Sequence, residues 1–123
     1  MHAARKRRLL LALAGASMFF ATPVKAADVV FDLRIERGQV PEKQRQLRVN
    51  EGDTVHLRFS TDRPLTLHLH GYDIEQRVEP EQVATMDFAA RATGRFPLHV
   101  HEPTGSGNGH AEALLLYVEV YPR

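Results

Sequence analysis

The stretch VNEGDTVHLRFSTDRPLTLHLH, residues 49–70, decides the fold class. Apolar and polar residues alternate along residues 55–59 and again along residues 65–69, and the turn-forming residues 62–64 separate the two runs. Successive side chains of a β-strand point to opposite faces of the sheet, so a period of two is typical of a strand with one buried face. The stretch therefore predicts two consecutive strands joined by a tight turn.

Similar alternating or apolar runs continue through most of the chain. They lie at residues 29–35, 47–49, 83–90, 96–101 and 111–121, and segments rich in Gly, Pro, Asn and Asp separate them. A further short strand is expected near Ile74, inside a loop at residues 71–82. No segment after residue 26 has the apolar stripe of an amphipathic helix. Seven or eight short strands predict an all-β sandwich or barrel that forms one domain.

Residues 1–26 have the features of an export signal. A basic cluster, RKRR at residues 5–8, precedes the uncharged run LLLALAGASMFFA at residues 9–21, and Val24 and Ala26 suit cleavage after Ala26. A helix as short as the uncharged run is only about 20 Å long, whereas the hydrocarbon core of a bilayer is roughly 30 Å thick. We therefore expect a cleaved signal peptide at residues 1–26 rather than a membrane anchor.

Removal of the signal peptide changes the charge of the protein. The whole chain has 16 basic and 15 acidic residues, whereas residues 27–123 keep 11 basic and 15 acidic residues and a net charge of −4. A mildly acidic domain is a poor match for nucleic acids and anionic lipids, so we expect neither partner after cleavage. The expected location is the periplasm or another exported compartment, reached by a Sec-type route. The pair Arg7-Arg8 before the leucines leaves the twin-arginine route open.

The histidines of the second half are the candidate functional residues. Five of the seven histidines lie there, in two His-x-His pairs and after a glycine-rich loop at residues 104–109: His68, His70, His99, His101 and His110. Residues i and i+2 of a strand share a face and lie about 6.6 Å apart, so each pair presents two imidazoles together. If the two strands meet, four imidazoles converge, and the loop lets His110 join them. We predict a metal site there, and a structural role for the isolated His56.

The chemistry of the donors restricts the metal. The sequence has no cysteine, which excludes disulfides, thiolate ligands and a thiol nucleophile. Imidazole without thiolate suits Cu(II), zinc or nickel, and the Irving–Williams order favours copper. Imidazoles bind metals in their neutral form, so we expect the affinity to fall below about pH 6. The nearest expected carboxylates are Asp73 and Glu102, which would orient a ring N–H or, for Glu102, supply a weak oxygen ligand. Solvated histidines without a metal remain the alternative.

Three segments share their order and pattern with a known family. They are VNEGDTVHLRF at residues 49–59, LTLHLHGYDI at residues 65–74 and ATGRFPLHVHE at residues 92–102, followed by a final strand. On these motifs the chain resembles the cupredoxin superfamily, and HLHG and HVH resemble the His-x-His-Gly and His-Cys-His motifs of multicopper oxidases. The resemblance implies a Greek-key β-sandwich or barrel of seven to eight strands and copper as cofactor. It places His70 as the first ligand, with His68 as its support.

The chain departs from the cupredoxin pattern where that family has its blue-copper cysteine. Val100 stands near that position, and no Met follows the last His. A blue, thiolate-bonded site therefore cannot form, and the expected site is an all-histidine, non-blue one. Loss of the copper–thiolate bond disfavours fast electron transfer and favours copper binding, delivery or storage. The alternation of the histidines with leucines and Val100 also predicts that the imidazoles lie on the outside of the fold.

A second, shorter resemblance implies an alternative function. PLHVHE at residues 97–102 is similar to the His-Val-His-Glu strand of copper–zinc superoxide dismutases, although this chain lacks that family's disulfide cysteines. The expectation is a non-enzymatic, exported copper-binding protein, whose partners are the metal ion and a periplasmic copper donor or acceptor protein. The alternatives are a dismutase-like or oxidase-like copper oxidoreductase, an electron-transfer protein, and a metal-free adhesion or assembly module.

Overall fold

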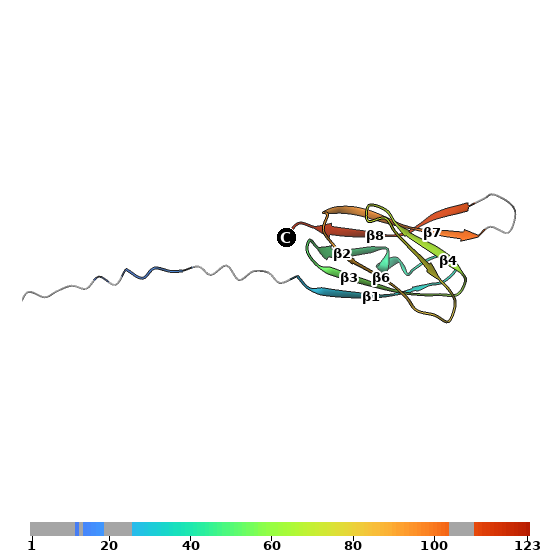
Figure 1. Ribbon diagram of the computed structural model, residues 1–123, viewed down its shortest axis with the longest axis horizontal. Coiled ribbons are helices and arrows are strands. Elements are labelled where there is room, and N and C mark those ends of the chain that lie inside the picture. Colours follow the sequence, from blue (N-terminus) through green and yellow to red (C-terminus); the bar gives the residue numbers. More distant parts are fainter. Residues whose placement is uncertain (1–11, 13, 19–25, 104–109) are drawn as a thin grey trace, which may run out of the picture.

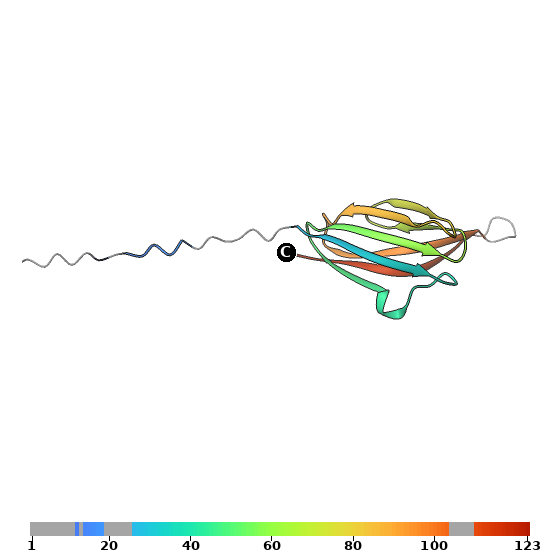
Figure 2. The same cartoon turned by 90° about the horizontal axis from the view of Figure 1, so that it is seen from below.

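The computed structural model describes residues 12, 14–18, 26–103 and 110–123, without the side chains of His110 and Ala111. These ranges contain one short 3-10 helix, Glu42–Gln44, and eight strands. The strands are β1 (Asp28–Ile35), β2 (Gln46–Asn50), β3 (Thr54–Thr61), β4 (Leu65–Leu69), β5 (Ile74–Val78), β6 (Ala84–Ala89), β7 (Gly94–Pro103) and β8 (His110–Tyr121). Two sheets face each other, which confirms the predicted all-β sandwich (Figures 1 and 2).

The order of the strands in the sheets differs from their order in the chain. One sheet has the order β1-β3-β6, and the other has the order β2-β8-β7-β4-β5. The pairs β1–β3 and β2–β8 are parallel, whereas the remaining pairs are antiparallel. The chain therefore crosses between the sheets several times, and strands distant in sequence become neighbours. One such pair is β4 and β7, which carry the two His-x-His motifs.

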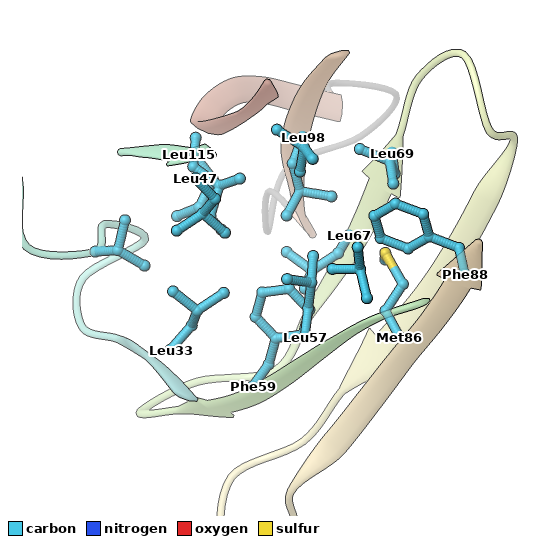
Figure 3. Packing of buried hydrophobic residues seen from close by; sticks show 14 of the residues in the cluster. Leu33, Leu47, Leu57, Phe59, Leu67, Leu69, Met86, Phe88, Leu98 and Leu115 are labelled. Carbon is cyan, nitrogen blue, oxygen red and sulfur yellow. The ribbon is translucent and has the colours of Figure 1, made fainter. Parts of the chain in front are cut away.

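The alternating residues of both sheets meet in one core. Figure 3 shows side chains of the three-stranded sheet, among them Leu57, Phe59 and Met86, facing Leu67 and Leu98 of the five-stranded sheet. Leu57, Phe59, Leu67 and Leu98 are completely buried. The period of two in the sequence thus marks the faces of the two sheets that become buried when the sheets pack together.

Strand β8 departs from strict alternation at one point. The β7–β8 register shifts between Leu98 and His99, so that Leu98 pairs with Leu116 and His99 pairs with Leu114. Leu115 and Leu116 are both buried, as expected where a β-bulge adds one residue to a strand. The bulge leaves Glu112 and Leu114 on the outer face of the sheet, next to β7. The apolar run at residues 111–121 is therefore a strand with one outer face rather than one buried on both faces.

Two predictions about the termini and loops fall largely outside the described residues. The predicted signal peptide includes residues 1–11, 13 and 19–25, and the predicted glycine-rich loop is residues 104–109, all of which lie outside them. Both remain predictions. Among the residues that are described, no helix is long and apolar enough to cross a bilayer.

The packing predicts which side chains stabilise the sandwich. Leu57→Ala removes a completely buried side chain, so we expect it to lower the free energy of unfolding by about 2–5 kcal/mol. Val30→Ala, in the same sheet but 53% exposed, is the control and should change it by less than about 0.5 kcal/mol. Urea denaturation of both variants measures the difference. Equal losses would show that the two sheet faces are assigned incorrectly.

Candidate metal centre

The pairing of β4 with β7 brings the two His-x-His motifs side by side. The strands are antiparallel neighbours, and His68 lies directly opposite His99 while Thr66 lies opposite His101. The leucines that alternate with the histidines on these strands, Leu67, Leu69 and Leu98, are completely buried. The four imidazoles therefore share the outer face of the five-stranded sheet. This confirms both the predicted meeting of the pairs and their outward direction.

Three donor atoms form a close triangle at this face. His70 Nε2 lies 2.7 Å from His99 Nδ1 and 3.2 Å from Glu112 Oε1, and His99 Nδ1 lies 2.6 Å from the same oxygen. Nitrogen and oxygen ligands bound to one Zn²⁺-sized ion at about 2.0–2.1 Å are roughly 2.8–3.4 Å from each other. The observed separations lie within or just below this range, so small side-chain shifts bring all three donors to one ion.

The other predicted ligands surround this triangle at greater distances. His101 Nε2 lies 3.7 Å from Glu112 Oε1. The His68 ring lies against the His70 ring, with 4.1 Å between centroids and 52° between planes, and its centroid is 6.3 Å from that of His101. The backbone of His110 pairs with Pro103 at the start of β8, and its side chain lies outside the described residues. Among the predicted ligands whose side chains are described, His70 and His99 are the two that belong to the donor triangle.

Glu112 is a candidate ligand that the sequence analysis missed. The nearest carboxylates were expected to be Asp73 and Glu102, but neither belongs to the cluster that the described residues form. Asp73 lies in an exposed turn, and Glu102 lies 3.9 Å from Arg63 and packs against Gly38. Glu112 reaches the imidazoles because β8 is the other neighbour of β7, where it pairs with His101. The cluster that the described residues form therefore has both nitrogen and oxygen donors, whereas the sequence analysis expected histidines alone.

The environment of Glu112 keeps its carboxylate ionised. Partial desolvation acts to raise its pKa, but hydrogen bonds from His70 and His99, with the charges of His99 and His101, outweigh it and lower the pKa below its ordinary value. The side chain remains 42% exposed. The group is thus an anionic oxygen donor that lies among imidazoles and is open to solvent, which suits a divalent cation.

Comparison with solved structures identifies the fold of this chain, whereas comparison with sequences finds no match. No protein-family model and no curated protein sequence matches this chain. Among solved structures, the periplasmic domain of subunit II of cytochrome oxidase (CoxB) from Bradyrhizobium japonicum matches with a TM-score of 0.59 at 13% identity, over 80% of this chain and 88% of that one. A multicopper oxidase matches with a TM-score of 0.55 at 21% identity, over 76% of this chain and 42% of that one. The chain has a cupredoxin-like fold.

A third match supports the cupredoxin-like assignment. The Cu-containing nitrite reductase (NirK) from Thermus scotoductus SA-01 has a TM-score of 0.54 at 21% identity, over 78% of this chain and 28% of that one. The chain spans less than half the length of this reductase and of the multicopper oxidase. Because all identities are below 25%, the likeness concerns the fold, and the chemistry of this chain has to be argued from its own residues.

An aromatic support positions His70 at the end of β4 in this cupredoxin-like sandwich. The His70 backbone N–H donates to the Pro97 carbonyl oxygen at 3.0 Å, and the next residue, Gly71, has a φ of +87°. A Cβ on Gly71 would collide with the ring of Phe96, which in turn packs edge-on against Tyr72 with 4.8 Å between centroids. Only glycine fits both the backbone angle and the space at residue 71. Gly71 therefore fixes the position of the backbone from which the His70 side chain extends.

Gly71→Ala tests this support against a matched control. Gly52 has a similar φ of +91° but no atom within 4 Å of a Cβ built on it, so Gly52→Ala isolates the backbone strain of roughly 1–2 kcal/mol. We expect Gly71→Ala to cost that strain plus about 1–3 kcal/mol of overpacking, and to weaken metal binding, which Gly52→Ala leaves unchanged. Urea denaturation and metal titration give the two readouts. Equal behaviour of the variants would contradict the role of Gly71.

His56 lies apart from the cluster, on the outer face of the other sheet. Its Nδ1 lies 2.6 Å from Asp87 Oδ1 on β6, and its Nε2 lies 3.3 Å from Asp28 Oδ1 on β1. Hydrogen bonds to Asp87 and then to Asp28 raise the pKa of His56 above 6.5. Both ring nitrogens are thus engaged by carboxylates across three strands, which suits a structural cation rather than a metal ligand.

The raised pKa of His56 predicts a pH-dependent contribution to stability. A proton bound more tightly in the folded state stabilises it fully below pH 6.5, and this contribution disappears as the pH rises through the raised pKa. We therefore expect His56→Gln to lower the Tm at pH 5.5 and to leave it nearly unchanged at pH 9. Arg58→Gln is the control, because Arg58 pairs with Asp32 at 3.5 Å and stays charged at both pH values. A loss from His56→Gln that is equal at both pH values would contradict this account.

Proposed function

We propose that this protein is an exported, periplasmic copper-binding protein with a non-blue site on the outer face of its five-stranded sheet. The observation that carries the proposal is the triangle of His70, His99 and Glu112, whose donor atoms lie 2.6–3.2 Å apart. His68, His101 and His110 are proposed to complete or support the site. The export step is proposed from the signal-like residues 1–26.

The donor set favours copper over other divalent ions. Imidazole nitrogens with one carboxylate oxygen suit Cu(II), and copper stands at the top of the affinity order for such sites. Zinc and nickel accept the same donors and are the alternatives. The cupredoxin-like matches include proteins that are described as copper-containing, which supports copper without deciding it.

The exposure of the site supports binding, delivery or storage as its role. The side chains of His70, His99 and Glu112 are 38%, 26% and 42% exposed. An ion held there would be reachable by a second protein, so the proposed partners are the ion and a periplasmic copper donor or acceptor. The absence of cysteine from the sequence removes the copper–thiolate bond and argues against an electron-transfer role.

The same exposure supports one alternative function. An ion held by three or four donors on an open face keeps positions for a small molecule, as a dismutase-like or oxidase-like oxidoreductase requires. Assays of superoxide removal and oxygen reduction on copper-loaded protein separate the two functions. Rates no greater than those of free copper exclude the enzyme, whereas higher rates that are lost in His99→Ala would replace the binding role with it.

Copper titration of residues 27–123, which contain all eight strands, tests the proposed site. We expect one Cu(II) per chain with nitrogen hyperfine structure in electron spin resonance. Glu112→Gln keeps the shape of the side chain but removes its charge, and should weaken binding at least tenfold, the minimum expected even for groups that only support a ligand.

Glu75→Gln provides the matched control. Glu75 is an exposed carboxylate on β5, directly opposite His68, and has no place in the donor triangle. The Glu75→Gln variant should bind copper as tightly as the unchanged chain does. A loss of copper affinity that is confined to Glu112→Gln then reports coordination by Glu112 rather than an effect of net charge. Copper binding by the double variant His70→Ala/His99→Ala that is as tight as in the unchanged chain would refute the site.

A further inference from the structure

A second charged cluster lies at the opposite end of the sandwich and concerns the start of the folded domain. Asp53, in the turn between β2 and β3, has a side chain that is only 3% exposed. Its Oδ2 accepts the Asn50 backbone N–H at 2.9 Å, and its Oδ1 accepts the Ala27 backbone N–H at 3.2 Å and an Arg123 guanidinium N–H at 2.6 Å. One buried carboxylate therefore joins a turn to the segment before β1 and to the segment after β8.

The Ala27 nitrogen has a special position in this cluster. It is the atom that becomes an α-amino group if the chain is cut after Ala26, where Val24 and Ala26 form the small-residue pattern that a signal peptidase recognises. The Ala27 carbonyl oxygen accepts the Thr54 N–H at 2.9 Å, and Asp28 pairs with Thr54 as the first residue of β1. These contacts hold the backbone on the C-terminal side of the proposed cut.

We propose that leader removal creates a structural ion pair between the new α-ammonium group of Ala27 and the buried carboxylate of Asp53. Hydrolysis breaks the Ala26–Ala27 C–N bond and consumes one water. A carboxylate forms on Ala26, and the Ala27 nitrogen gains the protons of an ammonium group. The inference rests on the export part of the proposed function and not on its copper site.

The charges around Asp53 favour this exchange of an amide donor for a cation. Charge-assisted hydrogen bonds are roughly twice as strong as neutral ones, and a buried carboxylate gains most from such donors. Arg123 shares Oδ1 and is a like charge that opposes part of this gain, while the second oxygen, Oδ2, is bound by the Asn50 N–H. The hydrogen bond from Asn50, together with Arg123, already lowers the pKa of Asp53, so the partner is ionised at neutral pH.

The proposal predicts a specific cut and a specific stability order. The intact mass of protein exported from the full chain should correspond to cleavage between Ala26 and Ala27. In chelator, residues 27–123 with a free amine should melt at least roughly 4 °C above the same chain with an Nα-acetyl group, which restores the amide. A chain that begins at Ala26 should match the acetylated form.

Further measurements make the test decisive. Asp53→Asn should abolish the difference between the free and acetylated chains. If that variant does not fold, the pKa of the Ala27 amine in the unchanged residues 27–123 gives a second test, measured by NMR after dimethylation of the amine. This pKa should exceed the 7.7–8.0 typical of free amino termini by about one unit, which is a tenfold change in proton affinity. Equal melting temperatures, an ordinary amine pKa, or cleavage at another bond would each overturn the proposal. Copper affinity should be the same with and without the acetyl group, so failure here leaves the metal site standing.

Discussion

The antiparallel register of β4 with β7 is the constraint on which the candidate metal centre depends. A shift of this register by one residue would turn the leucines to water and the histidines to the core, because side chains alternate strictly. Leu67, Leu69 and Leu98 are completely buried, and the transfer of each from water is worth roughly 1.5–3 kcal/mol. The core therefore enforces the convergence of the imidazoles on the outer face of the sheet.

The β-bulge in β8 then decides which further donor reaches the imidazoles. With Leu115 and Leu116 both directed into the core, Glu112 and Leu114 take the outer positions beside His101 and His99. Strict alternation from Leu116 would place Glu112 and Leu114 on the buried side instead. A local irregularity in packing thus changes the donor set from imidazole alone to imidazole with carboxylate, and it adds a negative charge that favours a cation.

Sequence patterns predicted the strands and their buried faces well, but they predicted poorly which strands pair with each other. The alternation of residues 55–59 and 65–69 predicted strands, their inner faces and the outward imidazoles, because the period of two is a local property. The parallel pairs β1–β3 and β2–β8 were not predictable, since nothing local in a strand specifies a partner distant in sequence. Glu112 was missed for the same reason: its place depends on the bulge and on the β7–β8 pairing. Its one signal was its place as the first of two acidic residues, Glu112 and Glu119, in the apolar run after His110.

The two charged clusters lie at opposite ends of β8, which separates the candidate metal centre from the buried carboxylate of Asp53. Glu112 joins the imidazoles near the start of that strand, whereas Tyr121, at its end, pairs with Asn50 beside the turn that holds Asp53. Nine residues of strand span about 30 Å, and substitutions farther apart than about 10 Å usually act independently. Substitutions on the open face should therefore leave the contacts of Asp53 with Ala27 and Arg123 in place. A binding site on the outside of a finished core gains this independence because none of its donors contributes to the core.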